Sequence, residues 1–173
     1  MSNIDDFNRV IGIVFSKLYD NFPVPLDIHS SHIILDIFGP EKDGISISKD
    51  DQGEFDFMMT DETTASRAKA FEMTRVAQNY DTIFTSSMCW LSVEGFVRYS
   101  DELPDIYSNA VLTEKGLKAL SLIPAGLEAS IGESLVQTVK SGARDGLGKI
   151  AKQAICEWGP TVLGNIALGI MKP

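Results

Sequence analysis

The residues that most often carry catalysis or bind metals are scarce in this sequence, which has two histidines and two cysteines among 173 residues. His29 and His32 stand three apart, but the segment around them has loop or strand character and no third ligand is evident. We therefore predict two solvated histidines rather than a metal pair. Cys89 and Cys156 lie in apolar contexts without metal or redox spacing, which predicts buried, reduced thiols. No catalytic, cofactor-binding or metal-ligating residue is expected.

Motifs for phosphate or calcium binding are also missing. Residues 142–149 form a glycine-rich run with basic members, but the run lacks the P-loop pattern and does not follow a predicted strand. The acidic run at residues 50–56 lacks the regular oxygen ligands and the terminal bidentate glutamate of a calcium loop. A solvated hairpin turn is the better interpretation. The sequence thus predicts a protein that is not an enzyme.

Long apolar runs are absent as well. No stretch of about 18 uncharged apolar residues occurs, so no membrane-spanning helix is predicted. The first ten residues are acidic and lack the basic-then-apolar pattern of a secretion signal. These features predict a cytoplasmic protein.

Basic residues are few, and the net charge is −9. The imbalance lies in residues 1–125, which hold ten Lys or Arg and twenty Asp or Glu, whereas residues 126–173 are nearly neutral. An acidic body repels the phosphates of DNA and RNA, whose neutralisation supplies most of the affinity of nucleic-acid-binding proteins. The charge instead suits a basic protein partner.

Hydrophobic periodicity predicts an α+β fold. Apolar residues at helical spacing predict helices, and alternation between turn residues predicts strands and an antiparallel β-meander. The predicted helices span residues 4–20, 64–78, 81–94, 114–122, 131–158 and 161–171. The predicted strands span residues 33–38, 44–49, 54–60, 96–99 and 110–112.

Two short stretches carry the one family resemblance. Residues 90–99 read WLSVEGFVRY, and residues 110–117 read AVLTEKGL. Gly95 permits a sharp exit from a helix, and Thr113 can cap the next one. Together they resemble the end of a bacterial winged-helix domain, where a helix ends at Glu-Gly and two strands enclose a wing. The resemblance implies a winged-helix-like domain over residues 1–125, with the β-meander inserted at about residues 29–63. We expect Trp90 to be largely buried in this domain.

The same resemblance implies a recognition helix at residues 81–91 and a wing at residues 100–105. The first segment holds no Lys or Arg, and the second is acidic. Readers of the major groove place Arg, Lys, Asn or Gln on this surface, with basic phosphate contacts beside it. Specific binding of a DNA duplex is therefore not expected.

The remaining residues, 126–173, are predicted to form a glycine-rich helical tail. Ser130 and Glu133 have the form of a capping box, and an apolar stripe then recurs every three or four residues as far as Trp158. This pattern predicts one long helix over residues 131–158 and a break at Gly159-Pro160. We expect the face of Gly142 and Gly146 to lie against a packed surface.

The sequence leaves three roles open for this tail. It can pack on its own domain, self-associate or bind a partner, or contact a membrane surface. The residues proposed for contact with a partner or membrane are Gly142, Gly146, Lys149, Lys152, Trp158, Leu163 and Ile166. The first choice of function is a non-catalytic interaction protein whose acidic winged-helix-like body and helical tail bind or restrain a protein partner. The alternatives are a membrane-active effector acting through the tail and a DNA-binding transcriptional regulator.

Overall fold

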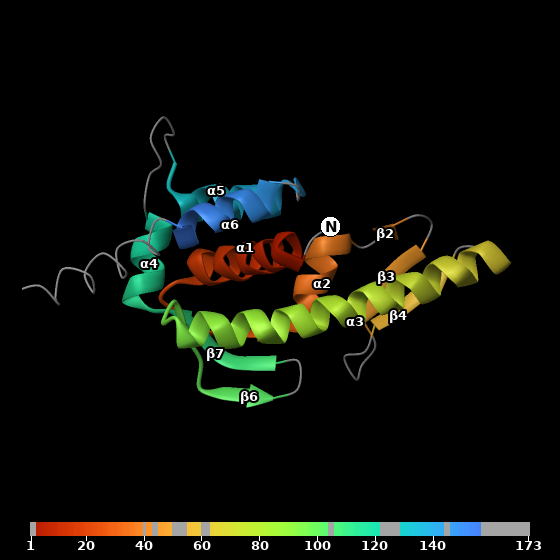
Figure 1. The fold of residues 1–173 in the computed structure, drawn as a ribbon, viewed down its shortest axis with the longest axis horizontal. Coiled ribbons are helices and arrows are strands. Elements are labelled where there is room, and N and C mark those ends of the chain that lie inside the picture. Colours follow the sequence, from red (N-terminus) through yellow and green to blue (C-terminus); the bar gives the residue numbers. More distant parts are fainter. Residues whose placement is uncertain are drawn as a thin grey trace, which may run out of the picture.

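The computed structural model describes residues 3–39, 41–42, 45–49, 55–59, 63–103, 106–121, 129–143 and 146–156. These residues form an α+β fold with two antiparallel sheets (Figure 1), as the periodicity predicts. The helices are α1 Asn3–Asn21, α2 Ser30–Phe38, α3 Thr64–Val93, α4 Glu114–Ser121, α5 Ile131–Lys140 and α6 Leu147–Cys156. The strands are β1 Leu26–His29, β2 Glu41–Lys42, β3 Ile45–Lys49, β4 Phe55–Met59, β5 Val97–Arg98, β6 Asp101–Leu103 and β7 Ile106–Leu112.

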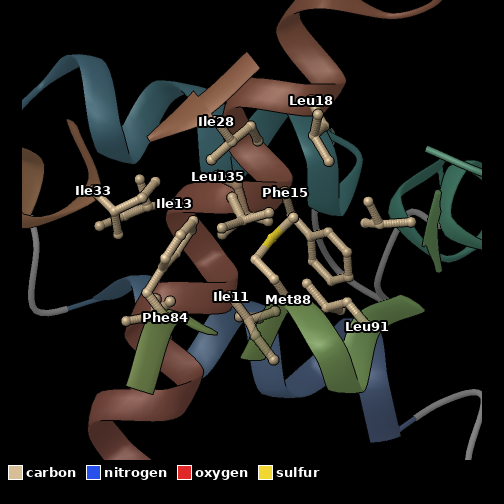
Figure 2. Close-up of a cluster of buried hydrophobic side chains, with 14 of the residues drawn as sticks. Ile11, Ile13, Phe15, Leu18, Ile28, Ile33, Phe84, Met88, Leu91 and Leu135 are labelled. Carbon is tan, nitrogen blue, oxygen red and sulfur yellow. The ribbon is translucent and has the colours of Figure 1, made fainter. Parts of the chain in front are cut away.

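Helix α1 forms the centre of the molecule. Every residue from Val10 to Ser16 is buried, so this helix is covered on all sides rather than along one stripe. In Figure 1 it lies between the α5–α6 pair and α3, and it contacts all three of these helices. Its apolar side chains meet those of neighbouring elements in one core, in which Phe15 approaches Met88 and Leu91 (Figure 2).

The larger sheet holds strands that are distant in the sequence. β7 lies in the middle, with β1 on one side and β5 and β6 on the other. β1 pairs with β7 through Leu26 and Ala110, and through Ile28 and Tyr107. This pairing joins the segment after α1 to the hairpin after α3.

The second sheet has the order β2-β3-β4, and β3 and β4 correspond to two strands of the predicted meander. β3 pairs with β4 in regular antiparallel register, from Ile45 opposite Met59 to Lys49 opposite Phe55. The strands predicted at residues 44–49 and 54–60 are confirmed over the described parts of those ranges. β4 contacts the N-terminal half of α3, which extends beyond the rest of the fold (Figure 1).

The strand predicted at residues 33–38 is wrong, because these residues belong to helix α2. Ile33, Ile34 and Ile37 of α2 are buried, whereas His32, which precedes them in the sequence, is exposed. The spacing i, i+1, i+4 is that of one helical face. Packing on α1 and α3 has outweighed the preference of isoleucine for strands.

The two helices predicted at residues 64–78 and 81–94 are one continuous helix, α3. Tyr80 and Phe84 are both buried at a spacing of four, so the apolar face continues through the expected gap. Trp90 is half-buried rather than largely buried. Its ring packs edge-on against Phe7 and is stacked on Phe96.

The single helix predicted over residues 131–158 is also wrong. The Ser130/Glu133 capping box is present and begins α5, but α5 ends at Lys140. Gly142 has φ +71, a left-handed conformation that turns the chain back. α6 then packs against both α5 and α1, so the described part of the tail covers its own fold (Figure 1). The predicted break at Gly159-Pro160 and the helix at 161–171 lie outside the described residues.

Candidate partner-binding surface

The exit from α3 is built by its own sequence. The amide of Phe96 donates to the Leu91 carbonyl (2.8 Å), and the amide of Gly95 donates to the Ser92 carbonyl (3.0 Å). With Gly95 at φ +71, these bonds form a Schellman motif, which ends a helix at a left-handed residue. The predicted helix end at Gly95 is thus confirmed.

Thr113 follows strand β7 and connects the C-terminal end of α3 to the start of α4. Its hydroxyl donates to the Gly95 carbonyl (2.6 Å) and accepts the Gly116 amide (3.1 Å), so Thr113 caps α4 as predicted. The Lys115 ammonium lies 4.2 Å from the centre of the Phe96 ring. Gly116 itself lies so close to the backbone just before β5 that an added Cβ would sit 2.2 Å from the Phe96 carbonyl oxygen. These contacts fix the hairpin relative to α3.

The hairpin is anchored to α3 by two tyrosines around one carboxylate. The Tyr107 hydroxyl is 3.1 Å from Glu102 Oε1 and 3.4 Å from the Thr85 carbonyl, and the Tyr99 hydroxyl is 3.5 Å from Glu102 Oε2. The two tyrosine rings are 4.8 Å apart, and the Tyr107 ring meets Phe84 edge-on. Burial and then the Glu102 carboxylate raise the pKa of Tyr107, so its hydroxyl remains a donor.

A bulge sets the position of the hairpin relative to β1. Asn109 has φ 53, and the pairing of β1 with β7 shifts register beside it. Its amide donates to Asp27 Oδ1 (2.9 Å), and its side-chain nitrogen donates to the Ser100 hydroxyl (3.0 Å). Asparagine tolerates the left-handed region better than most residues, which explains its place here.

The outer face of α3 and the hairpin form one surface, which we call the α3–wing surface. Its exposed α3 residues are Gln78, Asn79, Thr82, Thr85, Ser86 and Cys89. Asp101, Glu102 and Leu103 of β6 are all exposed, Leu103 to 54%. Glu102 is linked to α3 through the Tyr107 hydroxyl, which also contacts the Thr85 carbonyl. The described part of this surface carries carboxylates and neutral polar groups, and residues 78–93 include no Lys or Arg.

The tail residues proposed for partner or membrane contact lie in two different settings. Gly142 is exposed in the turn between α5 and α6, with no atom within 4 Å of an added Cβ. Gly146 has open space too, since its nearest neighbour would be a Thr138 methyl at 3.9 Å. The expected packed face at these two glycines is therefore not present. Lys149 and Lys152 lie on α6 and are exposed. Trp158, Leu163 and Ile166 lie outside the described residues.

Close approach of helices occurs at other glycines. An added Cβ on Gly12 would be 3.1 Å from the Leu147 carbonyl oxygen, and one on Gly132 would be 2.6 Å from the Tyr19 ring. These two glycines let α6 and α5 approach α1. Glycine thus permits close helix approach in the tail region, at Gly12 and Gly132 rather than at the predicted Gly142 and Gly146.

The histidines lie together at the start of α2. Their ring centres are 4.9 Å apart, with His29 half-buried and His32 exposed. They line an open pocket of about 370 Å³ with Lys17 and Lys140. Both lysines already form ion pairs, Lys17 with a carboxylate of α2 and Lys140 with one of α1. Within the described ranges, no three His, Cys, Asp or Glu residues are placed to hold a metal ion.

Cys89 is exposed on α3, so the prediction of a buried thiol is wrong for this residue. The side chain of Cys156 lies outside the described part of the structure. None of the described helices is long and apolar enough to cross a lipid bilayer.

The contacts of Tyr99, Glu102, Tyr107 and Asn109 were not predicted from the sequence. An asparagine just before an apolar run at residues 110–112 is a signal for a left-handed residue and could have indicated the bulge. Comparison of the chain with protein-family models, with curated proteins and with solved structures finds no match.

Proposed function

We propose that this chain is a non-catalytic, cytoplasmic interaction module, whose winged-helix-like body binds a basic protein through the α3–wing surface. The winged-helix assignment is supported by the local architecture. α3 ends at Glu94-Gly95, β5 leads into the hairpin, and β7 ends at Leu112-Thr113 before the closing helix α4. α1 supplies the first helix, and β1 adds a further strand to the sheet.

The observation that carries the proposal is the charge of the α3–wing surface. A DNA-reading surface needs cations for the phosphates and side chains that read base edges. Here the corresponding helix face is neutral, and Asp101 and Glu102 are exposed on the neighbouring strand. Carboxylates around an exposed apolar residue, Leu103, suit a protein partner that presents Lys or Arg around an apolar contact.

Cys89 offers a direct test because its thiol is exposed within the α3–wing surface. A photo-crosslinker attached to Cys89 in a Cys156→Ser background should capture a basic protein from an extract of the native host. Capture should weaken as salt is raised, since rim charges act through screened electrostatics. Capture should also be lost when Asp101→Lys is introduced into the same Cys156→Ser background.

A matched control carries the same probe on α4. Ser121 is exposed there, so Ser121→Cys in a chain lacking both native cysteines presents the probe away from the surface. Equal capture from both positions would contradict the proposal. So would a shift of random-sequence duplex DNA at low salt that is abolished by changes in the α3–wing surface.

A further inference from the structure

The groove between the start of α1 and α6 brings three cations together. Arg9, Lys149 and Lys152 line this groove of about 420 Å³. Lys149 and Lys152 form no ion pair with any described residue, and Arg9 makes one long hydrogen bond, to the Tyr80 hydroxyl at 3.5 Å. Lys17, Lys115 and Lys140 elsewhere on the fold each have a carboxylate within 4.0 Å.

The cations are positioned by the packing of the two helices. Lys149 and Lys152 are three residues apart, so they lie on the same face of α6. Arg9 is half-buried, and the hydroxyl it contacts is held by Asp6 at 2.6 Å. Asp6 is therefore engaged by Tyr80 and does not line the groove. Asp5 does line it, which leaves the lining with three cations and one carboxylate.

A buried amide adds a second, independent observation. Asn8 lines the groove, is only 8% exposed, and forms no side-chain hydrogen bond with any described residue. The Asn8 amide is not among the fully enclosed polar atoms of the described residues, so it is open to the groove and can donate to a ligand there. The groove also opens at the first turn of α1, where the helix dipole favours an anion.

We propose that the α1–α6 groove binds a phosphate group. Arg9, Lys149 and Lys152 neutralise its charge, and the Asn8 amide donates to one of its oxygens. The groove is separate from the α3–wing surface, so this site and the proposed partner surface can succeed or fail independently. The phosphate belongs either to a small soluble ligand or to a lipid headgroup, and Ile4 on the rim, 62% exposed, is placed to contact acyl chains in the second case.

Amide NMR of the full chain with sodium phosphate tests the site. At matched ionic strength, phosphate but not chloride should shift the amides of Asn8, Arg9 and Gly148 saturably. Lys149→Glu/Lys152→Glu should weaken this binding by about tenfold or more, because attraction becomes repulsion at both positions. Asn8→Ala should weaken it by roughly threefold to tenfold, as expected for one lost hydrogen bond.

The matched control is Lys69→Glu/Arg98→Glu. Both residues are exposed, neither lines the groove, and the change in net charge is the same. Phosphate binding should survive in this variant. Equal weakening in the two double variants, or phosphate shifts no larger or more localised than those of chloride, would overturn the proposal.

Vesicles distinguish the two sources of phosphate. If vesicles of phosphatidylcholine with phosphatidic acid float the wild type but not the Lys149→Glu/Lys152→Glu variant, and inorganic phosphate competes, the ligand is a headgroup. If phosphate shifts the groove amides and the vesicles do not bind, the ligand is a soluble phosphate compound. Vesicle binding that is unchanged in the groove variant, with no phosphate shift in the groove, would refute the site.

Discussion

At the scale of single residues, Asn109 combines a backbone cost with a structural task. Its φ of 53 lies where a side chain costs about 1–2 kcal/mol, and its amide and side chain hold β1 and the hairpin together. We expect Asn109→Ala to be less stable than Asn109→Gly by about 1 kcal/mol, although both lose the bond to Ser100. Urea denaturation of the three proteins measures the difference.

Equal stability of the alanine and glycine variants would show that the backbone at position 109 relaxes out of the left-handed region. A useful companion is Ser100→Ala, which removes the acceptor and leaves the backbone residue unchanged. It should lose stability by no more than the Asn109→Gly variant does.

Tyr80 gives the protein a stability change at alkaline pH. Burial, and then its hydrogen bond to Asp6, raises the pKa of Tyr80 to about 12 from an ordinary value of about 10. Below pH 10 the hydroxyl is neutral in both folded and unfolded chains, and its contribution is fully present. Between about 10 and 12 only the unfolded chain loses its proton, so stability must fall as the pH rises.

Chemical denaturation of wild type and Tyr80→Phe at pH 9 and at pH 11.5 measures this effect. The stability advantage of the wild type over Tyr80→Phe should shrink at the higher pH. Tyr107, whose pKa is also raised, is present in both proteins and cancels in the comparison. A constant difference between the two proteins would mean that Tyr80 ionises alike in the folded and unfolded states.

At the scale of elements, the sequence predicted those boundaries that are built by neighbouring residues. Gly95 ends α3, Thr113 caps α4, and Ser130 caps α5 with Glu133, because each signal works through hydrogen bonds within a few residues. The same local chemistry made the hairpin between β5 and β7 predictable. The exposed face of α3 in the candidate surface could therefore be predicted from the sequence. The contacts of Tyr99 and Tyr107 with Glu102, which anchor the hairpin, could not.

Elements whose form depends on distant partners were not predictable in this way. The run of apolar residues in α2 is compatible with a strand or a helix until its cover, α1 and α3, is known. The described part of the stripe from Val136 onward lies in α5 and, after the turn, in α6, and α1 offers both helices a surface of limited length. The turn at Gly142 lets both halves pack on that one surface. The α1–α6 groove exists only because of this turn, so Arg9 could not be associated with Lys149 in advance.

Two glycines in helices are expected to respond oppositely to the same substitution. Gly116→Ala places a methyl 2.2 Å from the Phe96 carbonyl oxygen, and a backbone atom cannot easily move away. Even after a gain in helix propensity, we expect a net loss of about 2 kcal/mol. Gly148→Ala meets Asn8 Cβ at 3.5 Å, an ordinary contact, and should be neutral or more stable by up to about 1 kcal/mol.

Thermal unfolding of the two variants beside the wild type distinguishes these outcomes. A Gly116→Ala protein as stable as the wild type would show that α4 can move away from Phe96 without loss of stability. The hydrogen bonds of Thr113 to Gly95 and Gly116 would then be unimportant for stability. A large loss in Gly148→Ala would mean that α1 and α6 are closer than an alanine allows.

At the scale of the whole molecule, α1 makes the body and the described tail interdependent. α5 and α6 cover one side of a helix whose residues from Val10 to Ser16 are all buried. A chain ending at residue 128 would expose that side to water, at about 25 cal/mol for each Å² of apolar surface. We therefore expect this truncated chain to lack cooperative unfolding and to bind the dye ANS.

Complementation in trans is the control for this truncation. Co-expression of residues 1–128 with residues 129–173 should restore a cooperative transition, since the missing surface is supplied by a separate chain. Cooperative unfolding of 1–128 alone, with native-like near-ultraviolet circular dichroism, would show that the body folds independently of α5 and α6.

During synthesis, the apolar surface of α1 leaves the ribosome long before its cover does. Leu147 and Ala151, which pack where Gly12 lets α6 approach, are translated near the far end of the described chain. Contacts so distant in sequence delay folding, and a nascent chain with an uncovered apolar helix is prone to aggregation. We expect the emerging N-terminal half to be a client of ribosome-associated chaperones, released from them when α6 closes over α1.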